Sequence, residues 1–303
     1  MFAPAAKKPV NGLIKRAFSL LELMIVIIIL GLLTAIALPI MSNLESEGRA
    51  VQELSGARAT VAAWREYAVD RDGELLKGYY PDSEPSEEPL YDFNGNQISA
   101  GPSQERWFWR LAPYLENPKE TLYPKALEQV RREFIDVPDH QYVATIHPAF
   151  GLNSEWVGGL GEDLSNGLYA LYEYGNLKRC PWIRTLSDVR NTSKITVFAS
   201  SRFGSEDNNA QGGVAPGIVE GFHRIESPTH PTSGTRWVTG DDGNTLATHT
   251  NKPVDHGFVS ARHNGRVVTA TVDGSTKLET LSDLADMRRW SDLAWKRDWK
   301  LVE

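Results

Sequence analysis

The sequence predicts an α+β fold, in which a long N-terminal α-helix packs on a C-terminal head that contains an antiparallel β-sheet. Three observations lead to this prediction. Residues 20–40 form an apolar run, residues 50–68 repeat apolar side chains at helical spacing, and Asn264-Gly265 separates two β-rich runs near the C-terminus. Because the apolar run is long enough to cross a bilayer, the first half of the helix is expected to be transmembrane.

The composition is that of a folded protein with an acidic balance. The chain has 303 residues, of which 41% are hydrophobic and 23% charged, and its net charge is −7. This length allows a sizeable core, and the acidic balance argues against nucleic acid as a partner. The single cysteine, Cys180, rules out an intramolecular disulfide, so the fold must depend on packing.

The apolar run carries one charge, Glu22. Four basic residues precede the run, Lys7, Lys8, Lys15 and Arg16. Positive residues before a membrane segment predict that the N-terminus stays in the cytoplasm. A carboxylate inside such a segment costs about 2.5–3.5 kcal/mol on insertion scales, which makes Glu22 a candidate functional residue. The simpler interpretation is a glutamate that snorkels to the membrane surface.

Two common types of N-terminal segment explain this region incompletely. A secretory signal peptide has a shorter apolar stretch, followed by a small-residue cleavage site. A plain signal anchor accounts for the length of the run and leaves Glu22 unexplained.

The stretch Ala17-Phe18-Ser19-Leu20-Leu21-Glu22 resembles the processing site of type IV prepilins and pseudopilins. In that family a prepilin peptidase cuts before a phenylalanine and methylates the new amino terminus. The fifth mature residue is glutamate, and a proline usually occupies mature position 22. A cut before Phe18 makes Glu22 the fifth residue and Pro39 the twenty-second, while Ala17 stands where the family has glycine.

The resemblance implies an organisation of the whole chain. It implies a leader peptide at 1–17, a transmembrane and filament-core helix at 18–40, an amphipathic half of the same helix at 41–70, and an extracytoplasmic head at 71–303. Such a protein is a single-pass protein of the bacterial cytoplasmic membrane, with a cytoplasmic N-terminus, until it enters a filament.

The resemblance also implies a function. The chain would be a structural subunit of a type II secretion system or a type IV pilus-like assembly. Its partners would be the prepilin peptidase, other pilin or pseudopilin subunits, and the membrane. The amino group of Phe18 is expected to pair with Glu22 of a neighbouring subunit, and Pro39 to bend the helix. The alternative is a membrane-anchored, adhesin-like surface binding protein that does not polymerise.

The helical pattern continues beyond the apolar run. One apolar stripe has steps of four and three residues, through Ala50, Leu54, Ala57, Val61, Trp64 and Ala68. The opposite face is expected to carry the charged residues Glu45, Glu47, Arg49, Glu53, Arg58 and Glu66. The sequence Asp70-Arg71-Asp72-Gly73 is expected to end the helix.

In the head, short helices are expected over 104–115 and 123–134, and a buried strand over 193–201. Asn-Gly is the favoured pair for a type I′ hairpin turn. We therefore predict a three-stranded antiparallel meander over 256–280, with Val259, Ala261, Val268, Ala270 and Val272 on one face. An amphipathic helix with Ser282 as its cap is expected over about 282–299.

The meander carries a second resemblance. His263 is followed by nine residues and then Asp273-Gly274. This spacing, over 263–274, is similar to the H-X9-DG domain at the C-terminus of one group of prepilin-like proteins. We expect a structural role for these residues, in which His263 forms a hydrogen bond near the hairpin, with Asp273 as one candidate partner.

We predict no enzymatic activity and no cofactor, because the sequence contains no serine-nucleophile motif, P-loop or dinucleotide fingerprint. Five of the seven histidines fall between 223 and 263, without the spacing of a standard zinc site. Calcium has candidate oxygen ligands in Asp92, Asn94, Asn96, Asp241 and Asp242. Turn chemistry accounts for these polar stretches equally well.

Overall fold

The computed structural model describes residues 20–80, 86–159, 182–204, 217–230, 234–235, 237–238 and 252–301. The side chains of residues 36–45, 230 and 234–235 lie outside the described residues. Residues 1–17 and Asp241 and Asp242 are also outside. The chain divides into two compact units, Met1–Glu45 and Ser46–Glu303, and the first helix spans both.

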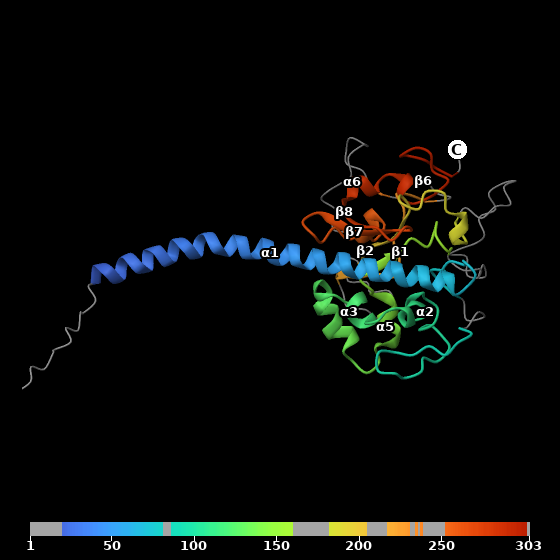
Figure 1. The fold of residues 1–303 in the computed structure, drawn as a ribbon, viewed down its shortest axis with the longest axis horizontal. Helices are drawn as coiled ribbons and strands as arrows, with labels where there is room; N and C mark the ends of the chain where they lie inside the picture. Colours follow the sequence, from blue (N-terminus) through green and yellow to red (C-terminus); the bar gives the residue numbers. More distant parts are fainter. Residues whose placement is uncertain are drawn as a thin grey trace, which may run out of the picture. The chain divides into compact units, whose positions relative to one another are not determined.

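That helix, α1, runs over Leu20–Val69 and confirms the predicted long N-terminal helix (Figure 1). In the first unit, its described side chains from Leu20 to Ala35 are all exposed. Among the described residues, no helix combines the length and the apolar character needed to cross a membrane. The transmembrane part of the predicted fold is therefore not confirmed, and the side chains of 36–45 in that region lie outside the described residues.

The Ser46–Val69 part of α1 belongs to the second unit and packs by the predicted stripe. Ala50, Ala57, Val61, Trp64 and Ala68 are buried, and Leu54 is partly buried against the same core. The helix ends where Asp72 takes a positive φ of 54° and the backbone N–H of Gly73 donates to the carbonyl of Ala68 at 2.7 Å. This left-handed ending agrees with the predicted stop, since it satisfies a carbonyl of the last turn.

The head contains a four-stranded antiparallel sheet with strand order β1-β2-β7-β8. The strands are β1 (Phe150–Leu152), β2 (Thr196–Ser200), β7 (Arg266–Thr271) and β8 (Thr276–Thr280). Every residue of β2 is buried, which confirms the strand predicted over 193–201. An N-terminal helix followed by an antiparallel sheet confirms the α+β class.

The predicted meander is correct in its second half and wrong in its first. Asn264 and Gly265 have φ values of 53° and 77°, and His263 pairs with Arg266, as a type I′ turn requires. However, the described residues 252–265 contribute no strand to the four-stranded sheet, and β7 pairs with β2 instead. Gly257 and Phe258 both take positive φ and break the extended run, so Val259 packs in a different cluster from Val268.

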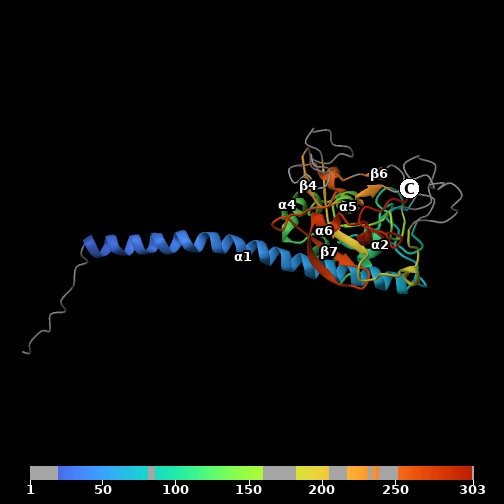
Figure 2. The ribbon, with the colours of Figure 1, turned by 90° about the horizontal axis from the view of Figure 1, so that it is seen from above.

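Within the second unit, α1 lies between the sheet and a group of short helices (Figure 1). These helices are α2 (Phe108–Leu111), α3 (Pro118–Leu122) and α5 (His140–Ile146). In the perpendicular view the same part of α1 runs along one side of the unit (Figure 2). A Cβ atom at Gly56 would lie 3.1 Å from the carbonyl of Thr121 in α3, so glycine permits this close packing.

The remaining elements are short. The two helical regions predicted over 104–115 and 123–134 form broken helices. In the first region α2 is followed by η1 (Ala112–Tyr114). The second region contains η2 (Lys125–Leu127), α4 (Glu128–Val130) and the π-helix η3 (Arg131–Ile135). The others are η4 (Leu186–Asp188), β3 (Arg202–Phe203), β4 (Val219–Glu220), β5 (Thr229–His230), β6 (Gly234–Thr235) and η5 (Pro253–His256).

The C-terminal helix predicted over about 282–299 is wrong. Within the described residues 252–301, this region forms only α6 (Leu281–Leu284) and η6 (Met287–Arg289), and Thr280 rather than Ser282 is the cap. The chain folds back, so that the N–H of Met287 donates to the carbonyl of Arg297 at 2.9 Å. This path buries Trp290 and Trp299 and leaves Trp295 69% exposed, which one helix face cannot do.

Candidate functional site

The first candidate site is the beginning of α1. Glu22 lies in the first turn and is exposed, among apolar side chains that are themselves exposed from Leu20 to Ala35. A helix that is apolar on all sides requires an apolar environment, either a lipid phase or other helices. The predicted processing residues Ala17 and Phe18 lie outside the described residues. Pro39 lies within α1, but its side chain is not described, so the predicted bend stays a prediction.

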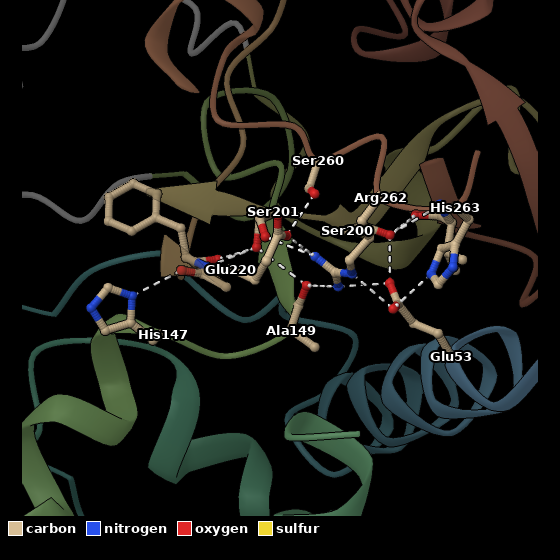
Figure 3. A network of polar contacts seen from close by, with 12 residues as sticks. Glu53, His147, Ala149, Ser200, Ser201, Glu220, Ser260, Arg262 and His263 are labelled. Atoms are coloured by element: carbon tan, nitrogen blue, oxygen red, sulfur yellow. Dashed lines mark hydrogen bonds and ion pairs between the residues drawn. The ribbon is translucent and has the colours of Figure 1, made fainter. Parts of the chain in front are cut away.

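The second candidate site is a buried charge network that joins α1 to the head (Figure 3). Its centre is Glu53, which is 0% exposed although the charge pattern placed it on the outer face of the helix. Glu53 Oε1 accepts hydrogen bonds from Arg262 Nη2 at 2.7 Å and from Ser200 Oγ at 2.6 Å. Glu53 Oε2 contacts Arg262 Nε at 2.9 Å and His263 Nε2 at 2.8 Å. The sequence prediction for this residue was wrong because a partner for each oxygen offsets the cost of burial.

Arg262 uses its full set of donors in this network. Besides the two contacts to Glu53, Nη1 donates to the carbonyl of Ser201 and to Glu220 Oε2, both at 2.9 Å. Nη2 also donates to the carbonyl of Ala149 at 3.0 Å. A guanidinium has five N–H donors in a fixed planar arrangement, and each finds an acceptor here. Lysine could not reproduce this pattern with its three donors at one nitrogen.

Two serines extend the network into the sheet. Ser200, at the end of β2, donates to Glu53 and accepts a hydrogen bond from the backbone N–H of Val268 in β7 at 3.0 Å. Ser260 Oγ donates to Glu220 Oε2 at 2.6 Å. One polar network therefore connects α1, β2, β4 and β7, and its charges come from three separate parts of the chain.

The network keeps its charges in the interior. Burial raises the pKa of Glu53, but the positive charge of Arg262 and the hydrogen bonds from His263 and Arg262 outweigh burial and lower that pKa to about 2. Burial lowers the pKa of Arg262, while the charges of Glu53 and Glu220 raise it above its ordinary value. Both groups are ionised at neutral pH, and such a buried pair stabilises a structure only while it is complete.

The structure separates two residues that the sequence analysis considered as partners. His263 Nε2 bonds Glu53 of α1, whereas Asp273 Oδ1 accepts hydrogen bonds from Thr271 Oγ1 at 2.7 Å and from the N–H of Ser275 at 3.0 Å. Asp273 thus holds the turn between β7 and β8, where Gly274 takes a φ of 88°. His263 lies at the hairpin, but its partner comes from a helix 210 residues earlier.

Sequence reasoning missed Glu53, Arg262, Ser200 and Glu220. A signal was available for Glu53, because it stands three residues after Ala50 and four before Ala57 and so falls on the buried stripe. For the other three no local pattern exists, since their partners are distant in sequence.

The candidate calcium ligands in the described residues form an ordinary turn. Asp92 Oδ1 accepts from the N–H groups of Asn94 and Asn96, both at 2.9 Å, and Oδ2 accepts from the side chains of Asn96 and Gln141. These bonds outweigh the effect of burial and lower the pKa of Asp92 to about 2. Among the described side chains, no three histidine, cysteine or acidic residues gather as a metal site. Asp241 and Asp242 lie outside the described residues.

Two histidines with lowered pKa values predict that the protein loses stability in weak acid. Burial and the charge of Arg106 lower the pKa of His147 from 6.5 to about 4, although a hydrogen bond with the carbonyl of Gly221 opposes this. Burial and the charges of Arg106 and Arg224 hold the pKa of His223 well below 6.5. The unfolded chain therefore binds more protons than the folded chain below pH 6.5, so stability falls from pH 6.5 towards pH 4.

Glu53 adds a second loss at lower pH. Its folded pKa lies below its ordinary value of 4.5, so the stabilisation is complete above that pH and disappears as the pH falls towards 2. This loss is on the order of 3 kcal/mol. Urea unfolding between pH 7.5 and about pH 2, followed by tryptophan fluorescence, measures both losses. The variant His147→Gln should reduce the first loss, and a stability that is constant from pH 7 to pH 4 would contradict the assignment.

Comparison with known proteins identifies one region of the chain. Residues 14–38 match the family model of the prokaryotic N-terminal methylation motif. No curated protein and no solved structure matches the chain significantly. The motif contains the predicted cut before Phe18 and Glu22, and its match supports a type IV pilin-like prepilin that is processed by a prepilin peptidase and is associated with a membrane or a pilus.

Proposed function

We propose that the chain is a pseudopilin-like structural subunit of a type II secretion system or a type IV pilus-like assembly. It is cut before Phe18 and assembles through α1. The observation that carries this proposal is the match of residues 14–38 to the N-terminal methylation motif, which continues directly into α1. The described side chains of α1 from Leu20 to Ala35 are exposed, as a helix needs in order to pack against lipid and then against other subunits.

Before assembly, residues 20–40 hold the subunit in the cytoplasmic membrane. The basic leader keeps the N-terminus in the cytoplasm, so the head is on the outer side. Processing creates a positive amino group at Phe18, four residues before Glu22. In a filament that amino group pairs with the Glu22 carboxylate of a neighbour, and a slip by one residue leaves both charges unpaired.

The head acts as a structural and display element rather than as an enzyme. The charge network around Glu53 supports this role, because its donors and acceptors are used to hold α1 against the sheet and leave Arg262 fully hydrogen-bonded. The His263-X9-Asp273-Gly274 spacing supports membership of the H-X9-DG group of prepilin-like proteins.

Mass spectrometry of the mature N-terminus tests this proposal. When the chain is expressed together with a prepilin peptidase, we expect loss of residues 1–17 and an N-methylated Phe18. A variant Ala17→Gly, which restores the glycine of the family, should be processed at least as completely. An intact residue 1 in cells that process a control prepilin would overturn the proposal and favour a plain membrane anchor.

A further inference from the structure

Two polar contacts join the ends of β7 to α1. At the first end, just before the turn into β7, His263 Nε2 contacts Glu53 Oε2 at 2.8 Å. At the other end, just after β7, the backbone carbonyl of Asp273 accepts a hydrogen bond from Arg65 Nη1 at 3.1 Å. The two residues of the H-X9-DG spacing, which do not share a bond in the described structure, both therefore contact the same helix.

The two contacts are separated by similar lengths of helix and of strand. Glu53 and Arg65 are twelve residues apart, which is about 18 Å along an α-helix. Arg266, which pairs with His263, is seven residues before Asp273, which is about 23 Å along a strand. The strand runs in the same direction as the helix, so one contact falls at each end of the shared length.

Between these contacts the helix and the strand contribute apolar side chains to one core cluster. Val268 and Ala270 of β7, and Val272 after it, belong to the same core cluster as Val61 and Trp64 of α1. Apolar burial is not directional. The apolar surface therefore determines how closely the strand packs on the helix more strongly than it determines where along the helix the strand lies. Hydrogen bonds at the two ends have a defined geometry and select one position.

The geometry points to a two-point clamp, in which His263 and Asp273-Gly274 fix the register of the head on the Ser46–Val69 part of α1. The clamp explains the nine-residue spacing, because the turn and the strand between the two contacts are nine residues long. The clamp extends the proposed function, and it rests on that function in one respect. In a subunit that assembles through α1, the clamp determines at which height the head is displayed.

The turn at the second end is built to present a carbonyl to the helix. Asp273 Oδ1 holds Thr271 and Ser275, and the N–H of Asp273 donates to the carbonyl of Thr192 at 3.1 Å. These bonds leave the Asp273 carbonyl for Arg65. Gly274 adopts a φ of 88°, a left-handed conformation that glycine takes without strain, so glycine suits this turn.

The test measures the position of the head on the helix by pulsed electron spin resonance. The full chain in detergent, with Cys180→Ser, carries spin labels at Ala62→Cys and Lys277→Cys, which are both exposed positions. We expect one narrow distance distribution. Adding His263→Ala and Arg65→Ala should broaden the distribution or shift it towards a second distance, on the scale of one helical turn of about 5 Å. His263→Gln, which keeps a donor, should retain the narrow distribution.

A folded double variant with an unchanged narrow distance would overturn the clamp, because apolar packing and the remaining Arg262–Glu53 contacts would then set the register without it. If the double variant does not fold, the single variant Arg65→Ala tests the contact with Asp273, since Arg65 is exposed and its replacement should not prevent folding. Amide exchange at Asp273, Gly274 and Ser275 should become about tenfold faster than in the control Arg58→Ala, which removes another exposed arginine of α1. Equal exchange in the two variants would overturn the assignment.

These measurements need neither processing nor a filament. A failed clamp would therefore leave the N-terminal processing result unchanged, and an unprocessed N-terminus would leave the clamp intact.

Discussion

Replacing Arg262 by alanine is expected to lower the free energy of unfolding by about 3–5 kcal/mol. The change leaves the carboxylate of Glu53, which is 0% exposed, without its main counter-charge, and it removes one of the donors to the carbonyls of Ser201 and Ala149. A single unpaired charge in an interior costs more than the pair contributes when it is complete. Urea unfolding of the purified protein at pH 7 measures the difference.

Two further variants are compared with Arg262→Ala. Arg58→Ala removes an exposed arginine from α1 and should change the stability by less than about 0.5 kcal/mol. Arg262→Lys should lie between the native protein and Arg262→Ala, because an ammonium keeps the charge but loses the planar set of donors. If Arg262→Ala and Arg58→Ala were equally stable, the network around Glu53 would contribute no net stability.

Replacing Glu22 by alanine is expected to abolish assembly while the protein still inserts into the membrane. Alanine removes the only charge of the 20–40 run, so insertion becomes more favourable, whereas the amino group of Phe18 loses its partner in the neighbouring subunit. Cell fractionation measures insertion, and filament recovery or secretion measures assembly.

Glu47→Ala is the matched control, because Glu47 is an exposed glutamate of the same helix. It should assemble like the native protein. If Glu22→Ala assembles and secretes normally, the pairing hypothesis fails, and a surface-anchored binding protein that does not polymerise becomes the better explanation.

The features that the sequence predicted correctly are those with a local cause. The long helix follows from an apolar run and a four-three repeat, and each position on it is defined by the residues three or four places away. Strand β2 follows from a short β-rich run, and the turn at Asn264-Gly265 follows from two residues that readily take positive φ. The match of residues 14–38 to a methylation motif is local in the same way.

The features that the sequence did not predict depend on contacts between distant residues. The choice of β2 rather than residues 256–263 as the neighbour of β7 depends on pairing across the sheet, and the region over 282–299 folds back because Trp290 and Trp299 are buried together in the head. Glu53 is the clearest case. A charge pattern assigns a glutamate to the surface, and only the arrival of Arg262 and His263 from more than 200 residues away makes its burial favourable.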